Sequence, residues 1–152
     1  MQINESGTDN PYPDVAKLIE QDLSLVSAKT IQNLRIVQSK DKVYVYKCLY
    51  DGNFAVIKYY EDEDDRREIL NYQILARHGI STIKPFVIGK ASLVLEDISE
   101  SEDWRMGNET DFEDEDVAKC LAHWYFAFHE NGSVAPELNT LYFEYDSITK
   151  VV

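Results

Sequence analysis

The sequence is poor in cysteine, glycine and proline, and it has no long hydrophobic run. Its two cysteines, Cys48 and Cys120, are too few for a disulfide framework, which favours a reducing, cytoplasmic setting. Six glycines and four prolines exclude a fibrous or linker-like chain. No apolar stretch reaches the roughly 18–20 residues that a membrane span requires, and the N-terminus has no signal-peptide pattern. We therefore expect a soluble protein that does not enter a membrane.

Basic residues are also scarce. The 152 residues include 15 Lys and Arg but 28 Asp and Glu, which gives a net charge of −13. Nonspecific nucleic-acid affinity comes largely from basic side chains that replace counterions on phosphates, so this charge excludes a nucleic-acid partner. The acidic excess begins at residue 61, because residues 61–152 contain 21 acids and eight bases.

The apolar residues, 44% of the chain, are enough for one packed core at this length. Their spacing predicts an α+β chain with a helix, three strands, a second helix and two more strands. The Asp-Gly pair in Asp51-Gly52-Asn53 indicates a tight hairpin, and Gly89-Lys90-Ala91 indicates a second turn. The predicted elements are a helix over 13–29, strands over 34–37, 43–50 and 54–60, a helix over 62–78, and strands over 85–88 and 92–98.

After the last predicted strand, residues 99–116 contain many acids without periodicity, which indicates a solvated connector. A further helix is predicted from about Glu115 to Asn131, with Gly132 as its stop. Four apolar residues lie on one face of this helix, namely Val117, Leu121, Tyr125 and Phe128. The tail to residue 152 has apolar residues but forms no complete unit.

A lysine and a glutamate stand out as candidates for chemistry. Lys58 ends the apolar run Ala55-Val56-Ile57-Lys58 of the third strand, and Glu68 lies inside the helix that follows. A buried ammonium is costly unless a carboxylate pairs with it, so the two side chains suit an ion pair. A lysine at a sheet edge often only extends to solvent, and Glu68 follows a cluster of exposed acids. The pair therefore has two readings, a functional site or a structural ion pair in an unrelated acidic domain.

Taken in order, these features resemble the aminoglycoside phosphotransferase and choline kinase family of small-molecule kinases. The resemblance spans nearly the whole chain: Lys58, Glu68 in a helix, the strand Leu93-Val94-Leu95-Glu96-Asp97-Ile98, then a helix that ends in an aromatic-His pair. It implies a kinase-like N-terminal lobe over 1–98, built on a five-stranded antiparallel sheet with an inserted helix. It also implies a nucleotide site in which Lys58 and Glu68 are the phosphate-positioning ion pair.

The same resemblance implies which other residues contact the nucleotide, ATP or GTP. The segment Ser39-Lys40-Asp41-Lys42-Val43 resembles the phosphate-covering loop, although it has no GxGxxG pattern. Val56 and Leu95 would pack against the base. The remaining implied contacts are those of the hinge after the fifth strand, namely Glu96 through its carbonyl, Asp97, and Ile98 through its amide.

The family's His-Gly-Asp catalytic run and its metal-binding Asn and Asp have no match after residue 98. We therefore expect 99–116 to be a connector and 117–152 to begin an incomplete C-terminal lobe. The chain would require no cofactor by itself and hold no metal, whereas a full-length parent would use Mg²⁺ with the nucleotide. The parent's acceptor would be hydroxylated and possibly cationic, such as an aminoglycoside or amino alcohol. The alternative is a non-catalytic kinase-lobe-like module, whose apolar face binds a C-terminal lobe, a dimer partner or another protein.

Overall fold

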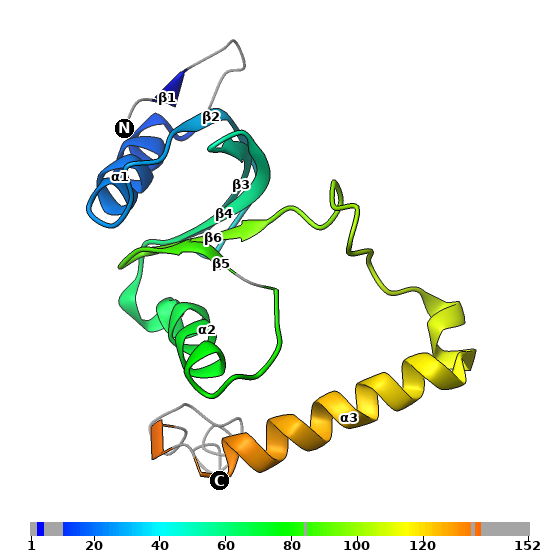
Figure 1. The fold of residues 1–152 in the computed structure, drawn as a ribbon. Helices are drawn as coiled ribbons and strands as arrows, with labels where there is room; N and C mark the ends of the chain where they lie inside the picture. The colour runs from blue at the N-terminus through cyan, green and yellow to red at the C-terminus, as the bar shows by residue number, and fades with distance from the viewer. Residues whose placement is uncertain (1–2, 5–10, 84, 135, 138–152) are drawn as a thin grey trace, which may run out of the picture.

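The computed structural model describes residues 3–4, 11–83, 85–134 and 136–137, and within them one sheet has helices on both faces (Figure 1). This α+β class agrees with the prediction. The elements are β1 (Ile3–Asn4), α1 (Pro13–Ser24), β2 (Ile31–Lys40), β3 (Val43–Tyr50), β4 (Asn53–Tyr60), the 3-10 helix η1 (Glu63–Arg66), α2 (Arg67–Arg77), β5 (Pro85–Ile88), β6 (Ser92–Glu96), the 3-10 helix η2 (Glu109–Glu113) and α3 (Glu115–Gly132).

Five antiparallel strands make up most of the sheet, in the order β2-β3-β4-β6-β5. The two-residue β1, which the sequence analysis missed, adds to β2 in parallel at the edge. Two-residue turns join β2 to β3 and β3 to β4. Both residues of each turn have positive φ, 50° and 63° at Asp41 and Lys42, 53° and 83° at Asp51 and Gly52. This type I′ geometry matches the natural twist of paired strands and fixes their register.

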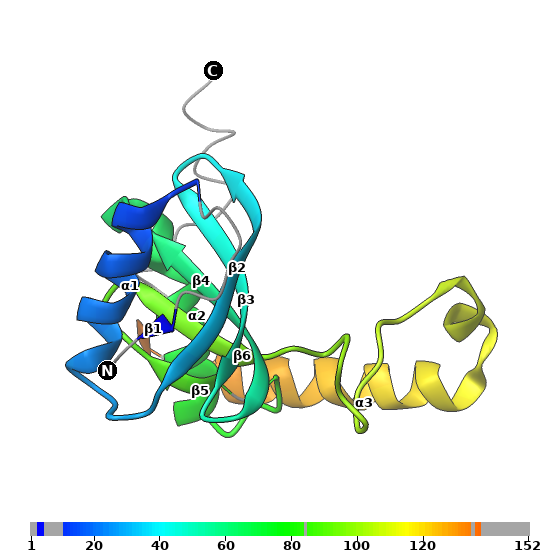
Figure 2. The ribbon, with the colours of Figure 1, turned by 90° about the horizontal axis from the view of Figure 1, so that it is seen from above.

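The side chains of β4 alternate between the two faces of the sheet. Ala55, Ile57 and Tyr59 point into the main core, where the fully buried Ile19 and Leu23 of α1 meet them. Each fully buried Ile or Leu contributes about 1.5–3 kcal/mol to this core. The intervening residues of β4 point to the other face of the sheet. The helix α2 lies on that face, opposite α1 (Figure 1, and from above in Figure 2). A smaller core there consists of Tyr60, Ile69, Leu93 and Leu95.

A polar contact fastens α1 to the turn between β5 and β6. The carboxylate of Asp22 accepts hydrogen bonds from the backbone amides of Lys90 and Ala91, each at 3.0 Å. Gly89 precedes them, and a Cβ atom at that position would collide with the Asp22 carboxylate. The contact joins the N-terminal helix to the strand pair that includes β6.

Several predicted boundaries were wrong, for identifiable reasons. The helix over 13–29 ends at Ser24, because Leu25 and Val26 lie outside the buried stripe, with exposed fractions of 82% and 53%. The strand over 34–37 extends over Ile31–Lys40, since pairing with β3 orders its polar flanks. The helix over 62–78 is the 3-10 turn η1 followed by α2, and its N-terminal acids stay exposed on η1. The strand over 92–98 ends at Glu96.

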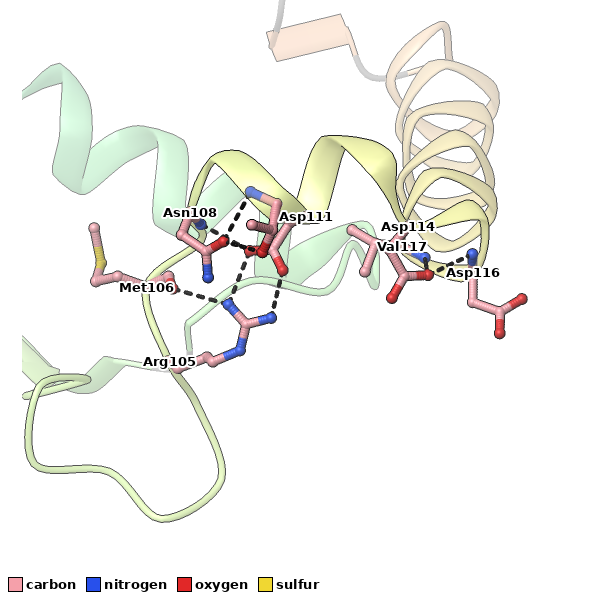
Figure 3. Close-up of polar contacts among 8 residues, drawn as sticks. Arg105, Met106, Asn108, Asp111, Asp114, Asp116 and Val117 are labelled. Carbon is pink, nitrogen blue, oxygen red and sulfur yellow. Dashed lines mark hydrogen bonds and ion pairs between the residues drawn. The ribbon is translucent and has the colours of Figure 1, made fainter.

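The acidic connector has local structure that the sequence analysis did not predict. Arg105 donates to both carboxylate oxygens of Asp111, at 2.8 and 2.5 Å. Asp111 also accepts from the amide of Asn108, whose side chain caps η2 in return (Figure 3). Asp114 then caps α3 by accepting from the amides of Asp116 and Val117. The connector thus leads directly into a capped helix.

The hydrogen bonds from Arg105 and from the Asn108 amide lower the pKa of Asp111 to about 2. An ordinary Asp titrates near about 3.9. Because the folded pKa is depressed, the contact stabilises the connector fully above about pH 4 and is lost as the pH falls through 2. We expect the Asp111 carboxyl signal in NMR to titrate near 2, and to move up toward 4 in Arg105→Gln. Arg77→Gln, which removes an arginine elsewhere, is the control; an equal shift in both variants would refute the assignment.

The predicted helix from about 115 to 131 is α3, Glu115–Gly132, and its first turns extend away from the sheet (Figure 1). Near its C-terminal half, the indole of Trp124 donates to the carbonyl of Ser81 at 2.6 Å. Three residues of the predicted apolar face are exposed, since Val117, Leu121 and Tyr125 have exposed fractions of 37%, 49% and 51%, whereas Phe128 is half-buried and stacks on Trp124. This apolar face of α3 has no covering layer among the residues described.

Candidate functional site

The structure brings Lys58 and Glu68 together on the α2 face of the sheet. Lys58 is on β4, and Glu68 is in the first turn of α2, where an acid interacts favourably with the helix dipole. The ammonium Nζ of Lys58 lies 2.7 Å from Oε1 of Glu68. The two side chains are 30% and 34% exposed, so the pair remains accessible to a ligand. Its role toward phosphates stays a prediction.

Tyr60 completes this ion pair, and the sequence analysis missed it. Its hydroxyl donates to the second oxygen of Glu68, Oε2, at 2.5 Å. Tyr60 is only 3% exposed, and burial, together with the contact to Glu68, raises the pKa of its phenol. The available signal was its spacing, because residues two apart on a strand point to the same face, as Lys58 and Tyr60 do.

A second ion pair crosses the same face. Nζ of Lys47, on β3, lies 2.7 Å from Oδ2 of Asp97, whose side chain is 5% exposed. The other oxygen of Asp97 accepts from the hydroxyl and the amide of Ser99, and Lys47 also donates to that hydroxyl at 2.6 Å. Burial alone would raise the pKa of Asp97, but the hydrogen bonds from Lys47 and Ser99 outweigh it, so the pKa lies below the ordinary value.

The Lys47–Asp97 pair bridges three strands. Neighbouring strands lie about 4.8 Å apart, so β3 and β6 are about 9.6 Å apart with β4 between them. Lys47 pairs in register with Val56 on β4, and Val56 with Leu95 on β6. The lysine side chain must therefore extend across β4 to reach Asp97. This contact secures the chain where it leaves the sheet.

Between the two ion pairs lies an apolar floor, formed by half-buried Val45 and Val56 and by buried Leu95. On the opposite face, a shallow hollow between α1 and the sheet is lined by residues that include Asp22, Tyr59 and Ala91. That hollow has no lysine and lies behind the sheet from Lys58. We therefore take the floor with its two ammonium groups as the candidate site.

The segment assigned to a phosphate-covering loop is the tip of the tight β2–β3 hairpin, and its role toward phosphates stays a prediction. Ser39 and Lys40 belong to β2, Val43 begins β3, and only Asp41 and Lys42 form the turn. The reason is the positive φ at both turn residues, which lets the ladder run to its end. Lys42 also pairs with Asp62 at 3.2 Å, which raises the pKa of its ammonium.

The predicted hinge lies at the end of β6, with Glu96 as the last residue of the strand and Asp97 and Ile98 just after it. Leu95 is 7% exposed and lies beneath the site, and Glu96 accepts from the hydroxyl of Ser101 at 2.6 Å. The side chain of Asp97 is engaged with Lys47 rather than turned outward. Within the described ranges, the backbone amide of Ile98 has no hydrogen-bond partner.

No protein-family model matches this sequence, and no curated protein matches it at a significant level. Within the part of the chain that the structure describes, no three Asp, Glu, His or Cys side chains lie close enough to hold a metal ion. None of its described helices is both long and apolar enough to cross a lipid bilayer. The case for function therefore depends on the geometry of the site.

Proposed function

We propose that this chain is the nucleotide-binding N-terminal part of a cytoplasmic small-molecule phosphotransferase. In this proposal the α2 face of the sheet binds ATP or GTP, and the whole enzyme phosphorylates a hydroxylated, possibly cationic, acceptor such as an aminoglycoside or amino alcohol. The supporting observation is the Lys58–Glu68 ion pair, in which Nζ lies 2.7 Å from Oε1 and both side chains are partly exposed on one face of the antiparallel sheet.

The ion pair suits a phosphate site for a physical reason. An ammonium group has three N–H donors, and Glu68 takes one of those of Lys58. Nζ of Lys58 has no other hydrogen-bond partner among the residues placed by the structure, so two donors remain for phosphate oxygens. The carboxylate holds the lysine in place before the ligand arrives, which lowers the entropy cost of binding.

The surrounding elements support the same proposal. The helix α2 enters between the third and fourth of the antiparallel strands, as the resemblance to small-molecule kinases requires. The floor of Val45, Val56 and Leu95 offers an apolar surface for a base, and the amide of Ile98 offers a donor at its edge. The residues described do not form a Mg²⁺ site, so we assign no metal ligand and no catalytic step to them.

A nucleotide titration followed by NMR tests the proposal. We expect Mg-ATP to cause saturable shifts in the backbone amide signals of Val45, Val56, Lys58 and Ile98, with little change along α3. Binding in the millimolar range would be sufficient, since such affinities give clear shifts. The absence of saturable shifts, or shifts confined to the hollow beside α1, would refute the proposal.

A second candidate function has one observation in its favour. The exposed apolar face of α3, with Leu121 and Tyr125 half exposed, favours a non-catalytic module that binds a partner protein or a second lobe. The two candidates depend on different residues. A nucleotide site requires Lys58, whereas a partner surface requires Leu121 and Tyr125, so substitutions at these positions separate the candidates.

A further inference from the structure

The carboxylate of Glu68 is shared between two donors from one strand. Oε1 accepts from Lys58 at 2.7 Å, and Oε2 accepts from Tyr60 at 2.5 Å. Lys58 and Tyr60 are two residues apart on β4, so their Cα atoms are about 6.6 Å apart. Glu68 comes from α2 and lies between them. Both of its oxygens are therefore held by separate groups.

The hydrogen bond from Tyr60 restricts the orientation in which the carboxylate of Glu68 can accept from Lys58. A carboxylate held through one oxygen alone can turn about its bond to the side chain. With Oε2 held by the phenol and Oε1 by the ammonium, the carboxylate is fixed in one orientation, in which Lys58 donates to Oε1 alone. Two N–H groups of Lys58 then stay available on the open side of the pair.

We propose that Tyr60 is a positioning residue of the phosphate site, which fixes the carboxylate of Glu68 so that Lys58 is presented to the phosphates of a bound nucleotide. This inference rests on the proposed nucleotide-binding function. It adds a third residue to the proposed site, which holds the carboxylate of Glu68 in place. Tyr60 acts through Glu68 and does not itself contact the ligand.

A purely structural role for Tyr60 is the competing explanation. Its ring packs in the smaller core beside Ile69, Leu93 and Leu95, and it is 3% exposed. The ring and the hydroxyl can be separated, because Tyr60→Phe keeps the packing and removes only the donor. Tyr59 provides a matched control, since it is the adjacent buried tyrosine, 7% exposed, on the opposite face of the sheet.

The first experiment compares Mg-ATP affinity in three proteins: the wild-type chain, Tyr60→Phe and Tyr59→Phe. The lower part of the coupling range for residues in one hydrogen-bonded network corresponds to about three- to ten-fold in affinity. We expect Tyr60→Phe to weaken Mg-ATP binding by that factor and Tyr59→Phe to leave it unchanged. The NMR signal of the Lys58 side-chain ε-carbon should also move in Tyr60→Phe and stay in place in Tyr59→Phe.

The outcomes separate this inference from the function on which it rests. If the wild-type chain does not bind Mg-ATP, the proposed function fails and the role of Tyr60 fails with it. If the wild-type chain binds but the two variants behave alike, the function stands and the role of Tyr60 is refuted.

A second measurement needs no nucleotide. Because the phenol of Tyr60 donates to Oε2 of Glu68, Glu68→Gln should shift the NMR signals of the labelled Tyr60 ring at neutral pH and leave those of Tyr59 in place. Unchanged Tyr60 ring signals would overturn the inference even if Tyr60→Phe failed to fold.

Discussion

Lys47→Met should lower the free energy of unfolding by about 3 kcal/mol at pH 7, because it leaves a buried carboxylate without its cation. Asp97 is 5% exposed at the side chain, and Ser99 would be its remaining partner. Asp97→Asn should cost less, since Lys47 is 32% exposed and can extend toward water. Urea unfolding of both variants measures this asymmetry.

The stability loss in Lys47→Met should depend on pH. In the wild-type chain the pKa of Asp97 is depressed, so the pair stabilises the fold above about pH 4 and is lost as the pH falls. Without Lys47, only Ser99 offsets the burial of Asp97, so the pKa of Asp97 should be higher than in the wild-type chain. The difference in stability between the variant and the wild-type chain should therefore narrow as the pH falls from 7 through 4.

Two controls make this result specific to the pair. Lys29→Met removes an exposed lysine whose side chain is 55% exposed, and it should change stability little. The double variant Lys47→Met with Asp97→Asn should recover part of the loss at pH 7, because no buried charge remains. A loss that is independent of pH, or equal in Lys29→Met, would contradict the account.

The Lys58–Glu68 contact was accessible from the sequence because it depends on short-range patterns. The apolar run up to Lys58 marks a strand, and the charge pattern of the next segment marks a helix. When a helix follows a strand and packs against the same sheet, the end of the strand lies close to the first turn of the helix. The distance between Lys58 and Glu68, and the hydrogen bond from Tyr60 to the same carboxylate, were not predicted. They depend on which face of β4 packs against α2, and that depends on the neighbouring strands.

The Lys47–Asp97 pair was missed for a related reason. It joins β3 to the end of β6 across β4, so it depends on the register of three strands. The turn Asp51-Gly52, which the sequence analysis recognised, fixes the register of β3 against β4. The register of β4 against β6 has no such turn, because η1, α2 and β5 lie between these two strands in the sequence. The register between strands that are far apart in the sequence is difficult to predict from a single sequence.

The second half of the chain was predicted in outline only. The bounds of α3 follow from a strong local signal, its acidic cap at Asp114 and the stop near Gly132. The order within the connector depends on the specific contact of Arg105 with Asp111, which composition does not reveal. Local sequence signals therefore predict α3, whereas the structure of the connector depends on a specific contact between side chains.

Lys58→Met should weaken Mg-ATP binding by about 30-fold or more, because each charge-assisted hydrogen bond to a phosphate contributes about 1.5–3 kcal/mol. The fold should survive, since methionine replaces the apolar stem of lysine and Tyr60 still donates to Glu68. We expect a cost in stability of about 1 kcal/mol or less for this partly exposed pair. NMR titration gives the affinity, and urea unfolding gives the stability.

The control for Lys58→Met is Lys90→Met, which removes an 80% exposed lysine from the turn between β5 and β6. Lys90→Met and Lys58→Met change the net charge by the same amount, so their comparison corrects for the general attraction of a nucleotide to positive charge. Lys58→Arg keeps the charge but replaces the compact ammonium with a planar group, and it should bind with intermediate affinity. If Lys58→Met binds Mg-ATP as well as Lys90→Met does, the ion pair with Glu68 is structural and the nucleotide site must be abandoned.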